Sequence, residues 1–415
     1  MRSSLWRTAA AVAVATAFSA TLAACGDSSD DSASSAAGTG TAATTTAASS
    51  DPIKIGYAVA LTGANNAWDG PILGGAKVAV EDINAKGGIN GRKLELITTD
   101  YKSDLTQATS AVQQALEKGA EIIVPSCDYD FGSPGAREAQ SKGVLVVGCA
   151  GDPRFGKQGV GDLVFNVLST TDVEGAAIAQ KAKADGLKHP YLLVDTTIAY
   201  SKSVCDYFKK AWEADGGTIA GEDTFKNADA SVSGQVSRLR DTKDADSVVI
   251  CSFLPGGPGV VKQIRGAGID LPILTPGSFD GDAWLEAVPT LSNFTNLSTG
   301  TLDGSDGREE WADLAERYEQ VNGEKPATAY GPLAGYTEIQ VIAKALEEAG
   351  GSTKGEDLKA ALESAGSFDT AYGPTEYTTE CHTPQGREMG ISTVENGKRT
   401  FGDWIAITET PEAPC

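Results

Sequence analysis

The chain has 415 residues, with 34 Lys and Arg against 56 Asp and Glu, and its formal net charge at pH 7 is −22. Nucleic-acid binding requires a basic face, so this charge argues against a nucleic-acid partner. The length is enough for two lobes, each with a hydrophobic core of its own.

The first 24 residues have the pattern of a secretory signal peptide. Arg2 and Arg7 precede an apolar run over residues 8–20, which is shorter than the ~18–20 residues needed to span a bilayer. The run leads into a Leu-Ala-Ala-Cys motif that ends at Cys25. A Cys at the first mature position resembles the lipobox of bacterial lipoproteins, where the thiol receives diacylglycerol. We therefore expect residues 1–24 to be removed and Cys25 to be lipidated; the alternative is ordinary secretory cleavage beside an incidental Cys.

The next segment has a composition typical of a linker. Residues 26–50 are mainly Ser, Ala, Thr, Gly and Asp, with no large apolar side chain. Such a segment cannot bury enough surface to offset the entropy lost on ordering. We expect residues 25–51 to form a lipidated, flexible tether that holds the folded part at the outer face of the cell membrane.

From residue 53 onwards, patterns typical of strands and helices alternate. In the first half they predict strand 53–59, helix 71–85, strand 94–97, helix 106–118, strand 122–124, helix 134–142 and strand 144–147. In the second half they predict helix 173–185, strand 191–194, helix 203–215, strand 218–220, helix 231–240, strand 247–250, helix 259–266 and strand 273–274. This alternation predicts an α/β fold of two doubly wound parallel-sheet lobes. Ligands bind outside the carboxyl ends of such strands, so the loops after the strands are the predicted site.

The sequence offers little that is typical of an enzyme. It contains no GxSxG, GxxxxGK[ST] or HExxH motif. Nucleophilic catalysis needs a His within hydrogen-bond reach. His189 precedes a predicted strand, at the end away from the predicted site, and His382 lies in a late loop beside Cys381. We therefore expect a binding protein without catalytic residues, cofactor or metal.

One motif connects the chain to a known family. The stretch 82–94, DINAKGGINGRKL, reads as a helix end followed by a turn that glycine permits. It resembles the N-terminal signature of the leucine/isoleucine/valine-binding protein family, which are type I periplasmic binding proteins serving ABC importers. The resemblance extends over residues 52–380. It implies two lobes that close on a solute about a multi-strand hinge, with crossovers near 168–172, 298–303 and 370–376.

The resemblance also implies domain limits and partners. The N-terminal lobe would comprise residues 52–169 plus 302–372, and the C-terminal lobe residues 170–301 plus 373–410. The implied partners are a small-molecule solute and the membrane permease of an ABC importer, with the protein acting outside the cell as a monomer. A ligand sensor on the same fold that signals to a membrane receptor is the alternative, because fold alone does not determine function.

In the first lobe, the resemblance points to two loops that carry aromatic and acidic residues. Trp68 matches the family aromatic that packs on the ligand, although it could instead be a structural aromatic. After the third strand the family places a hydroxyl that binds the ligand carboxylate. Here the loop offers Asp128, Tyr129 and Phe131, followed by Ser133, which is either a ligand hydroxyl or a helix N-cap.

The remaining matches come from the fourth strand and the second lobe. Cys149 and Gly151 can offer backbone N–H groups, and Tyr200 and Phe253 match family aromatics. The family has an acid that pairs with the ligand ammonium, and the resemblance places its position at Gly277 in this chain.

Two further residues complete the candidate site. Asp280 can substitute for the missing acid from a shifted register, and Tyr330 adds a further aromatic. These departures make a branched-chain amino acid less favoured, since a buried ammonium or carboxylate without a partner is costly. Amides, short peptides, polyamines and aromatic acids remain open as solutes.

Six cysteines follow Cys25, and an even number in an exported chain suggests disulfides. Metal binding is the weaker reading because there is no CxxC motif. In the frame of the resemblance, neighbouring strands and shared lobes favour the pairs Cys127–Cys149, Cys205–Cys251 and Cys381–Cys415.

Overall fold

The computed structural model describes residues 51–408, 410–411 and 415. The expected signal peptide, the lipidated Cys25 and all but the last residue of the tether lie outside the described residues. Within the described part of the chain, no helix combines the length and the apolar character that crossing a membrane requires.

The first lobe is built on a parallel five-stranded sheet with the order β2-β1-β3-β4-β5. Its strands are β1 (Ile53–Val59), β2 (Leu94–Asp100), β3 (Ile122–Pro125), β4 (Leu145–Gly148) and β5 (Val164–Asn166). The inner strands are almost wholly buried because helices cover both faces of the sheet, which is why these segments read as continuous apolar runs.

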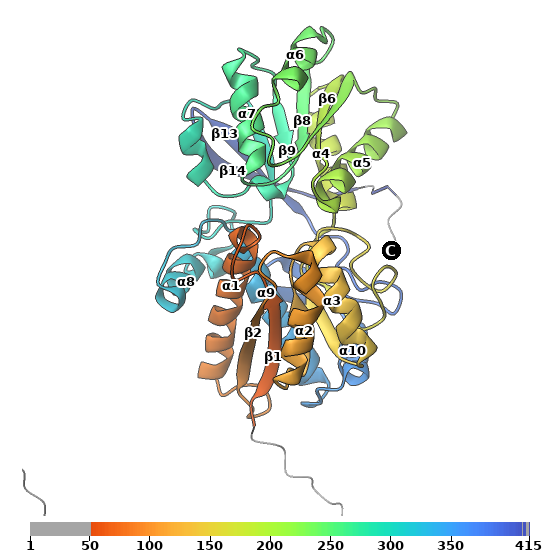
Figure 1. Ribbon diagram of the computed structural model, residues 1–415, viewed down its shortest axis with the longest axis vertical. Coiled ribbons are helices and arrows are strands. Elements are labelled where there is room, and N and C mark those ends of the chain that lie inside the picture. Colours follow the sequence, from red (N-terminus) through yellow and green to blue (C-terminus); the bar gives the residue numbers. More distant parts are fainter. Residues whose placement is uncertain (1–50, 409, 412–414) are drawn as a thin grey trace, which may run out of the picture. The chain divides into compact units, whose positions relative to one another are not determined.

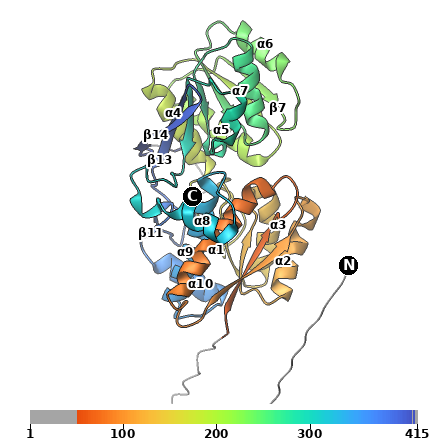
Figure 2. The same ribbon diagram turned by 90° about the vertical axis from the view of Figure 1, so that its left-hand side faces the viewer.

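Helices cover both faces of this sheet (Figures 1 and 2), and each face has its own hydrophobic core. One core is formed with α1 (Asn66–Ala85), α8 (Leu314–Asn322), α9 (Tyr330–Glu348) and α10 (Gly355–Ser364), and the other with α2 (Ala108–Glu117) and α3 (Tyr129–Ser141). Helices α1 and α9 touch backbone to backbone: a Cβ on Gly335 would lie 1.8 Å from the carbonyl oxygen of Ile72. This close contact holds the starts of the two helices, which carry Trp68 and Tyr330, next to each other.

The second lobe contains a seven-stranded sheet with the order β14-β13-β10-β9-β8-β6-β7. Its strands are β6 (Pro190–Asp195), β7 (Gly221–Phe225), β8 (Ser247–Cys251), β9 (Ile273–Thr275), β10 (Phe294–Ser298), β13 (Met389–Glu395) and β14 (Lys398–Ile405). Five strands are parallel, whereas β13 and β14 add to the edge in antiparallel orientation. Helices α4 (Thr171–Ala184) and α5 (Ala199–Ala214) pack on one face, and α6 (Ser233–Asp241) and α7 (Gly256–Gly266) on the other.

The chain remains part of the first lobe beyond residue 372, which is the limit that the resemblance implies for that lobe. Strand β12 (Gly373–Thr375) pairs with β11 (Phe368–Thr370). Tyr377 then packs edge-on against Phe165 with ring centroids 5.1 Å apart and belongs to the first-lobe core. Because this aromatic side chain is buried there, the chain crosses to the second lobe only shortly before β13.

Three disulfides join the described cysteines. Cys127 is bonded to Cys149, Cys205 to Cys251 and Cys381 to Cys415, which are the same three pairs that the sequence favours. The first pair joins the loops that follow β3 and β4, at the carboxyl edge of the first sheet.

Candidate functional site

A cavity of about 170 Å³ lies where loops of the two lobes meet. The first lobe contributes the start of α1, the loops after β3 and β4, and the start of α9. The second lobe contributes the start of α4, the loops after β6, β8 and β9, and Met389 of β13. Each lobe therefore presents the carboxyl ends of its parallel strands, where α/β sheets bind ligands.

Eight of the eleven candidate ligand residues line this cavity. They are Trp68, Asp128, Tyr129, Gly151, Tyr200, Phe253, Asp280 and Tyr330. Phe131, Ser133 and Cys149 do not line it. Phe131 packs against Tyr101 with ring centroids 5.5 Å apart, and the Ser133 hydroxyl accepts a hydrogen bond from Arg137 one helical turn later.

Aromatic side chains from the two lobes meet at the cavity. The rings of Trp68 and Phe253 are in edge-to-face contact with centroids 5.7 Å apart, a favourable geometry for two aromatic rings. Tyr200 lies against Gly151, where a Cβ would be only 2.7 Å from the Tyr200 ring. Glycine at position 151 therefore lets a second-lobe aromatic approach the first-lobe backbone.

Asp128 forms part of the first-lobe wall and caps a helix. One carboxylate oxygen accepts hydrogen bonds from the backbone N–H of Asp130 at 2.8 Å and of Phe131 at 3.3 Å, in the first turn of α3. Burial, together with the nearby charge of Asp130, raises the pKa of Asp128 to about 7. This carboxyl group thus organises its own loop as well as facing the cavity.

Asp69 lies beneath the same wall and does not reach the cavity. Its side chain is fully buried and accepts hydrogen bonds from the Ala60 N–H at 2.7 Å and the Ser126 hydroxyl at 3.0 Å. Burial raises the pKa of Asp69 to about 6, although its hydrogen bonds act in the opposite direction. Asp69 ties the end of β1 to the loop after β3, which positions the first-lobe residues of the site.

Glu174, which sequence reasoning did not select, is an acid of the second-lobe wall. It lies in the first turn of α4, and one carboxylate oxygen accepts a 2.6 Å hydrogen bond from the Tyr200 hydroxyl. The other accepts a 3.2 Å hydrogen bond from the Gly277 N–H. Burial raises the pKa of Glu174 to about 7 against the effect of these hydrogen bonds. Its position in a predicted helix gave no local signal of a ligand role.

Asp280 lines the cavity, but its carboxylate is occupied by backbone donors. One oxygen accepts hydrogen bonds from the Ala329 and Tyr330 N–H groups, each at 2.8 Å, at the start of α9 in the first lobe. The other accepts from the Gly281 N–H at 2.8 Å. Asp280 therefore bridges the two lobes, whereas the carboxylate nearest to Gly277 comes from Glu174: a Cβ at position 277 would be 3.0 Å from Glu174 Oε1.

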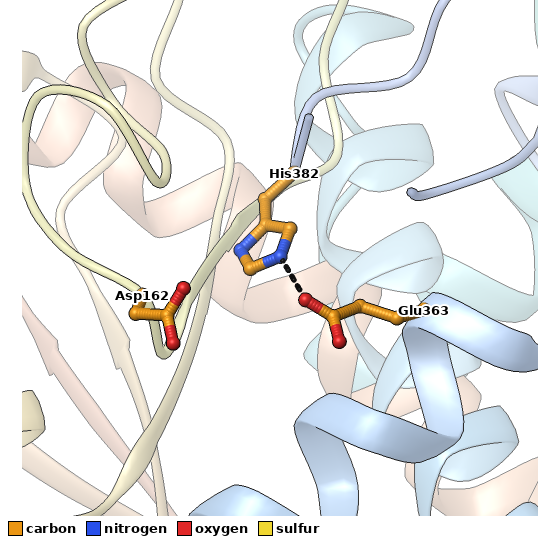
Figure 3. Close-up of side chains that lie close together, drawn as sticks. All are labelled: Asp162, Glu363 and His382. Carbon is orange, nitrogen blue, oxygen red and sulfur yellow. Dashed lines mark hydrogen bonds and ion pairs between the residues drawn. The ribbon is translucent and has the colours of Figure 1, made fainter. Parts of the chain in front are cut away.

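Figure 3 shows a second group of ionisable side chains, none of which lines the cavity. His382 Nε2 is 3.0 Å from Glu363 Oε1, and ligand atoms of Asp162, Glu363 and His382 lie within 4.8 Å of one another. Both oxygens of Asp162 already pair with lysines, one with Lys157 at 3.0 Å and the other with Lys359. Because two cations already neutralise this carboxylate, we assign no metal ion to the group.

Comparison with known proteins identifies relatives over most of the chain. Residues 52–399 match the family model described as periplasmic binding protein. A Leu/Ile/Val-binding protein of Rhizobium johnstonii is 27% identical over 332 residues, covering 78% of this chain and 87% of the relative. A leucine-, isoleucine-, valine-, threonine- and alanine-binding protein of Pseudomonas aeruginosa is 25% identical over 333 residues, covering 78% of this chain and 85% of the relative.

Solved structures share the fold. The branched-chain amino acid transporter substrate-binding protein LivJ of Streptococcus pneumoniae, in complex with isoleucine, superposes with a TM-score of 0.76 at 22% identity and covers 86% of this chain and 99% of its own. A solute-binding protein of an ABC transporter from R. palustris, in complex with benzoate, gives a TM-score of 0.75 at 18% identity, covering 88% and 99%. The predicted two-lobe α/β fold is thereby confirmed.

Proposed function

The chain belongs to the periplasmic binding protein family, and from that premise we propose that it is the extracytoplasmic solute-binding component of an ABC importer. The observation that carries the proposal is the cavity lined by both lobes. A solute held there contacts residues of both lobes at once. Because those contacts are complete only when the lobes are together, binding stabilises the closed arrangement.

The walls of the cavity support a small amino-acid-like, amide or aromatic solute. Trp68, Tyr200, Phe253 and Tyr330 offer flat apolar surface. Asp128 and Glu174 offer acceptors for N–H groups. The cavity of about 170 Å³ is smaller than the roughly 300–1,000 Å³ of drug-sized sites, which fits a compact solute. We propose capture without chemical conversion, as in the solute-binding relatives.

We propose further that Cys25 carries a lipid anchor at the outer face of the cell membrane. An exported binding protein must remain near its permease, and the segment 25–51 would let the folded part reach it. Incorporation of a labelled fatty acid into the wild-type chain, but not into a Cys25→Ala variant, tests this point. Equal labelling of both would contradict it.

A thermal-shift screen tests solute capture directly. Residues 51–415, which lie within one compact unit of the chain, would be heated with amino acids, amides, short peptides, polyamines and aromatic acids. A bound solute raises the unfolding midpoint with its concentration. We expect Trp68→Ala to remove that rise and Trp311→Ala, a tryptophan outside the cavity lining, to retain it. If no class of solute raises the midpoint, solute capture is wrong.

Uptake measurements separate import from the sensor alternative. In cells lacking the protein, uptake of the solute found in the screen should fall to background and recover when the gene is restored. Tight binding in the screen with unchanged uptake would instead favour a sensor that signals to a membrane receptor.

A further inference from the structure

We propose that Glu174 selects the solute and that the solute carries a cationic nitrogen, such as a primary ammonium group, on a compact apolar body. This inference rests on the proposed solute-binding function and names the chemical class that the same cavity accepts. It assigns recognition to the start of α4, a segment that the sequence predicts only as a helix.

The carboxylate of Glu174 is placed to receive such a group. Its residue is 7% exposed and lines the cavity. It accepts one hydrogen bond on each oxygen, from the Tyr200 hydroxyl and the Gly277 N–H. Both donors are electrically neutral, and each carboxylate oxygen can accept a further hydrogen bond. A buried carboxylate without a cationic partner is costly, so a solute cation beside Glu174 would be stabilising.

The other three acids of the cavity lining each take part in holding the fold together. Asp152 receives hydrogen bonds from the Arg154 guanidinium at 2.8 and 2.6 Å. Asp128 caps α3, and Asp280 binds the first backbone N–H groups of α9. Among the residues that line the cavity there is no Lys, Arg or His. The cavity therefore favours a cation over a carboxylate solute. We assign its recognition to Glu174, whose two oxygens are each held by one neutral donor.

Gly277 leaves space beside the carboxylate of Glu174. A Cβ there would be 3.0 Å from Glu174 Oε1, closer than most side-chain contacts. Glycine at this position leaves the carboxylate oxygen open on that side and lets the backbone N–H reach it. We expect the added methyl group of Gly277→Ala to crowd the Glu174 carboxylate sterically and to weaken binding of the cation.

The aromatic walls suit the same chemical class. The faces of Trp and Tyr rings attract cations, and the rings also cover apolar groups. Trp68, Tyr129 and Tyr330 come from one lobe and Tyr200 and Phe253 from the other. A small amine would therefore meet Glu174 at its nitrogen and aromatic surface over its remaining atoms.

Matched series of probes test the proposal. Benzylamine, benzyl alcohol and benzoate, together with isobutylamine, isobutanol and isobutyrate, keep the apolar body similar while the polar group changes its charge. Calorimetry on residues 51–415 should show the amines binding at least tenfold more tightly than their neutral and anionic partners. Glu174→Gln should weaken amine binding at least tenfold and leave the alcohols unchanged, whereas Glu81→Gln, on the exposed face of α1, should match the wild type.

Two results would overturn the inference and leave solute capture standing. One is tighter binding of a carboxylate probe than of its amine, and the other is amine binding that Glu174→Gln leaves within twofold. If these probes do not bind but the broader screen finds a solute without a cationic nitrogen, the inference is also wrong. Failure of every solute class in that screen would refute the proposed function itself.

Discussion

The two walls of the cavity use their buried acids differently. In the first lobe, the Cys127–Cys149 disulfide joins two loops, Asp128 caps α3, and Asp69 binds donors beneath the surface. In the second lobe, the Cys205–Cys251 disulfide ties α5 to the end of β8, and Glu174 faces the cavity with one hydrogen bond on each carboxylate oxygen. On our proposal for Glu174, buried acids of similar chemistry stabilise the wall in one lobe and receive the solute in the other.

The largest effect on the free energy of unfolding should come from removing Asp69, the acid beneath the first-lobe wall of the cavity. Asp69→Ala leaves the Ala60 N–H and the Ser126 hydroxyl without their acceptor. Each buried donor left unpaired costs about 1–3 kcal/mol, so we expect the free energy of unfolding to fall by about 3–5 kcal/mol. Urea denaturation measures it. Asp162→Ala, at a half-exposed ion pair, should cost less than about 1 kcal/mol; equal losses would show that Asp69 does not organise the wall.

Removal of the disulfide between the first-lobe loops should rank next. The cysteines are 22 positions apart, and closing a loop of this order stabilises a protein by about 3 kcal/mol. The Cys127→Ser, Cys149→Ser double variant should therefore unfold more easily and also bind solute more weakly. The matched double variant at Cys381 and Cys415, outside the cavity lining, should lose stability alone. Unchanged solute affinity in the first variant would break the proposed link between this disulfide and the site.

Glu174 in the second-lobe wall should make the free energy of unfolding depend on pH. Burial raises the pKa of Glu174 from 4.5 to about 7, so between these values the unfolded chain loses its proton while the folded chain keeps it. The stabilisation is complete below about pH 4.5 and disappears as pH rises through about 7, by up to about 3 kcal/mol. Urea midpoints of the solute-free protein at pH 5 and pH 7.5 measure this change.

A variant assigns part of that pH dependence to its source. Asp128, whose pKa is also raised to about 7, contributes in the same direction. Glu174→Gln should therefore reduce the fall in stability between pH 5 and pH 7.5 without abolishing it. The same slope in wild type and variant would mean that Glu174 does not titrate in this range.

The smallest effect, on solute affinity, should come from removing a hydrogen bond that joins the two lobes. Asp130 accepts a 3.0 Å hydrogen bond from the Ala199 N–H across the lobes. Asp130→Ala removes about 0.5–1.5 kcal/mol of contact that exists only when the lobes are together, so solute affinity should fall a few-fold by calorimetry. Asp229→Ala, which removes a bond within the second lobe to the Lys226 N–H, should leave affinity unchanged. A similar loss in both would deny Asp130 a role in closure.

The aromatic part of the site could be predicted from the sequence. Trp68, Tyr200 and Phe253, to which the family resemblance points, line the cavity, and each lies after a strand that the α/β alternation predicts. Tyr330 lines it too, but it begins α9 directly after α8 rather than after a strand. Phe131 also lies after a predicted strand but turns onto Tyr101 in the core. Which way a residue in the first turn of a helix points depends on the helix rotation, which packing determines.

The sequence by itself determined the two-lobe α/β architecture, because periodicity and turn residues are local patterns that persist along the chain. Only the tertiary structure decided that Glu174 faces the cavity. Glu174 meets the Gly277 N–H across 103 positions of sequence, and Asp280 meets the start of α9 across 49 positions. A carboxylate's role follows from the donors around it, and here those donors come together only when distant segments pack.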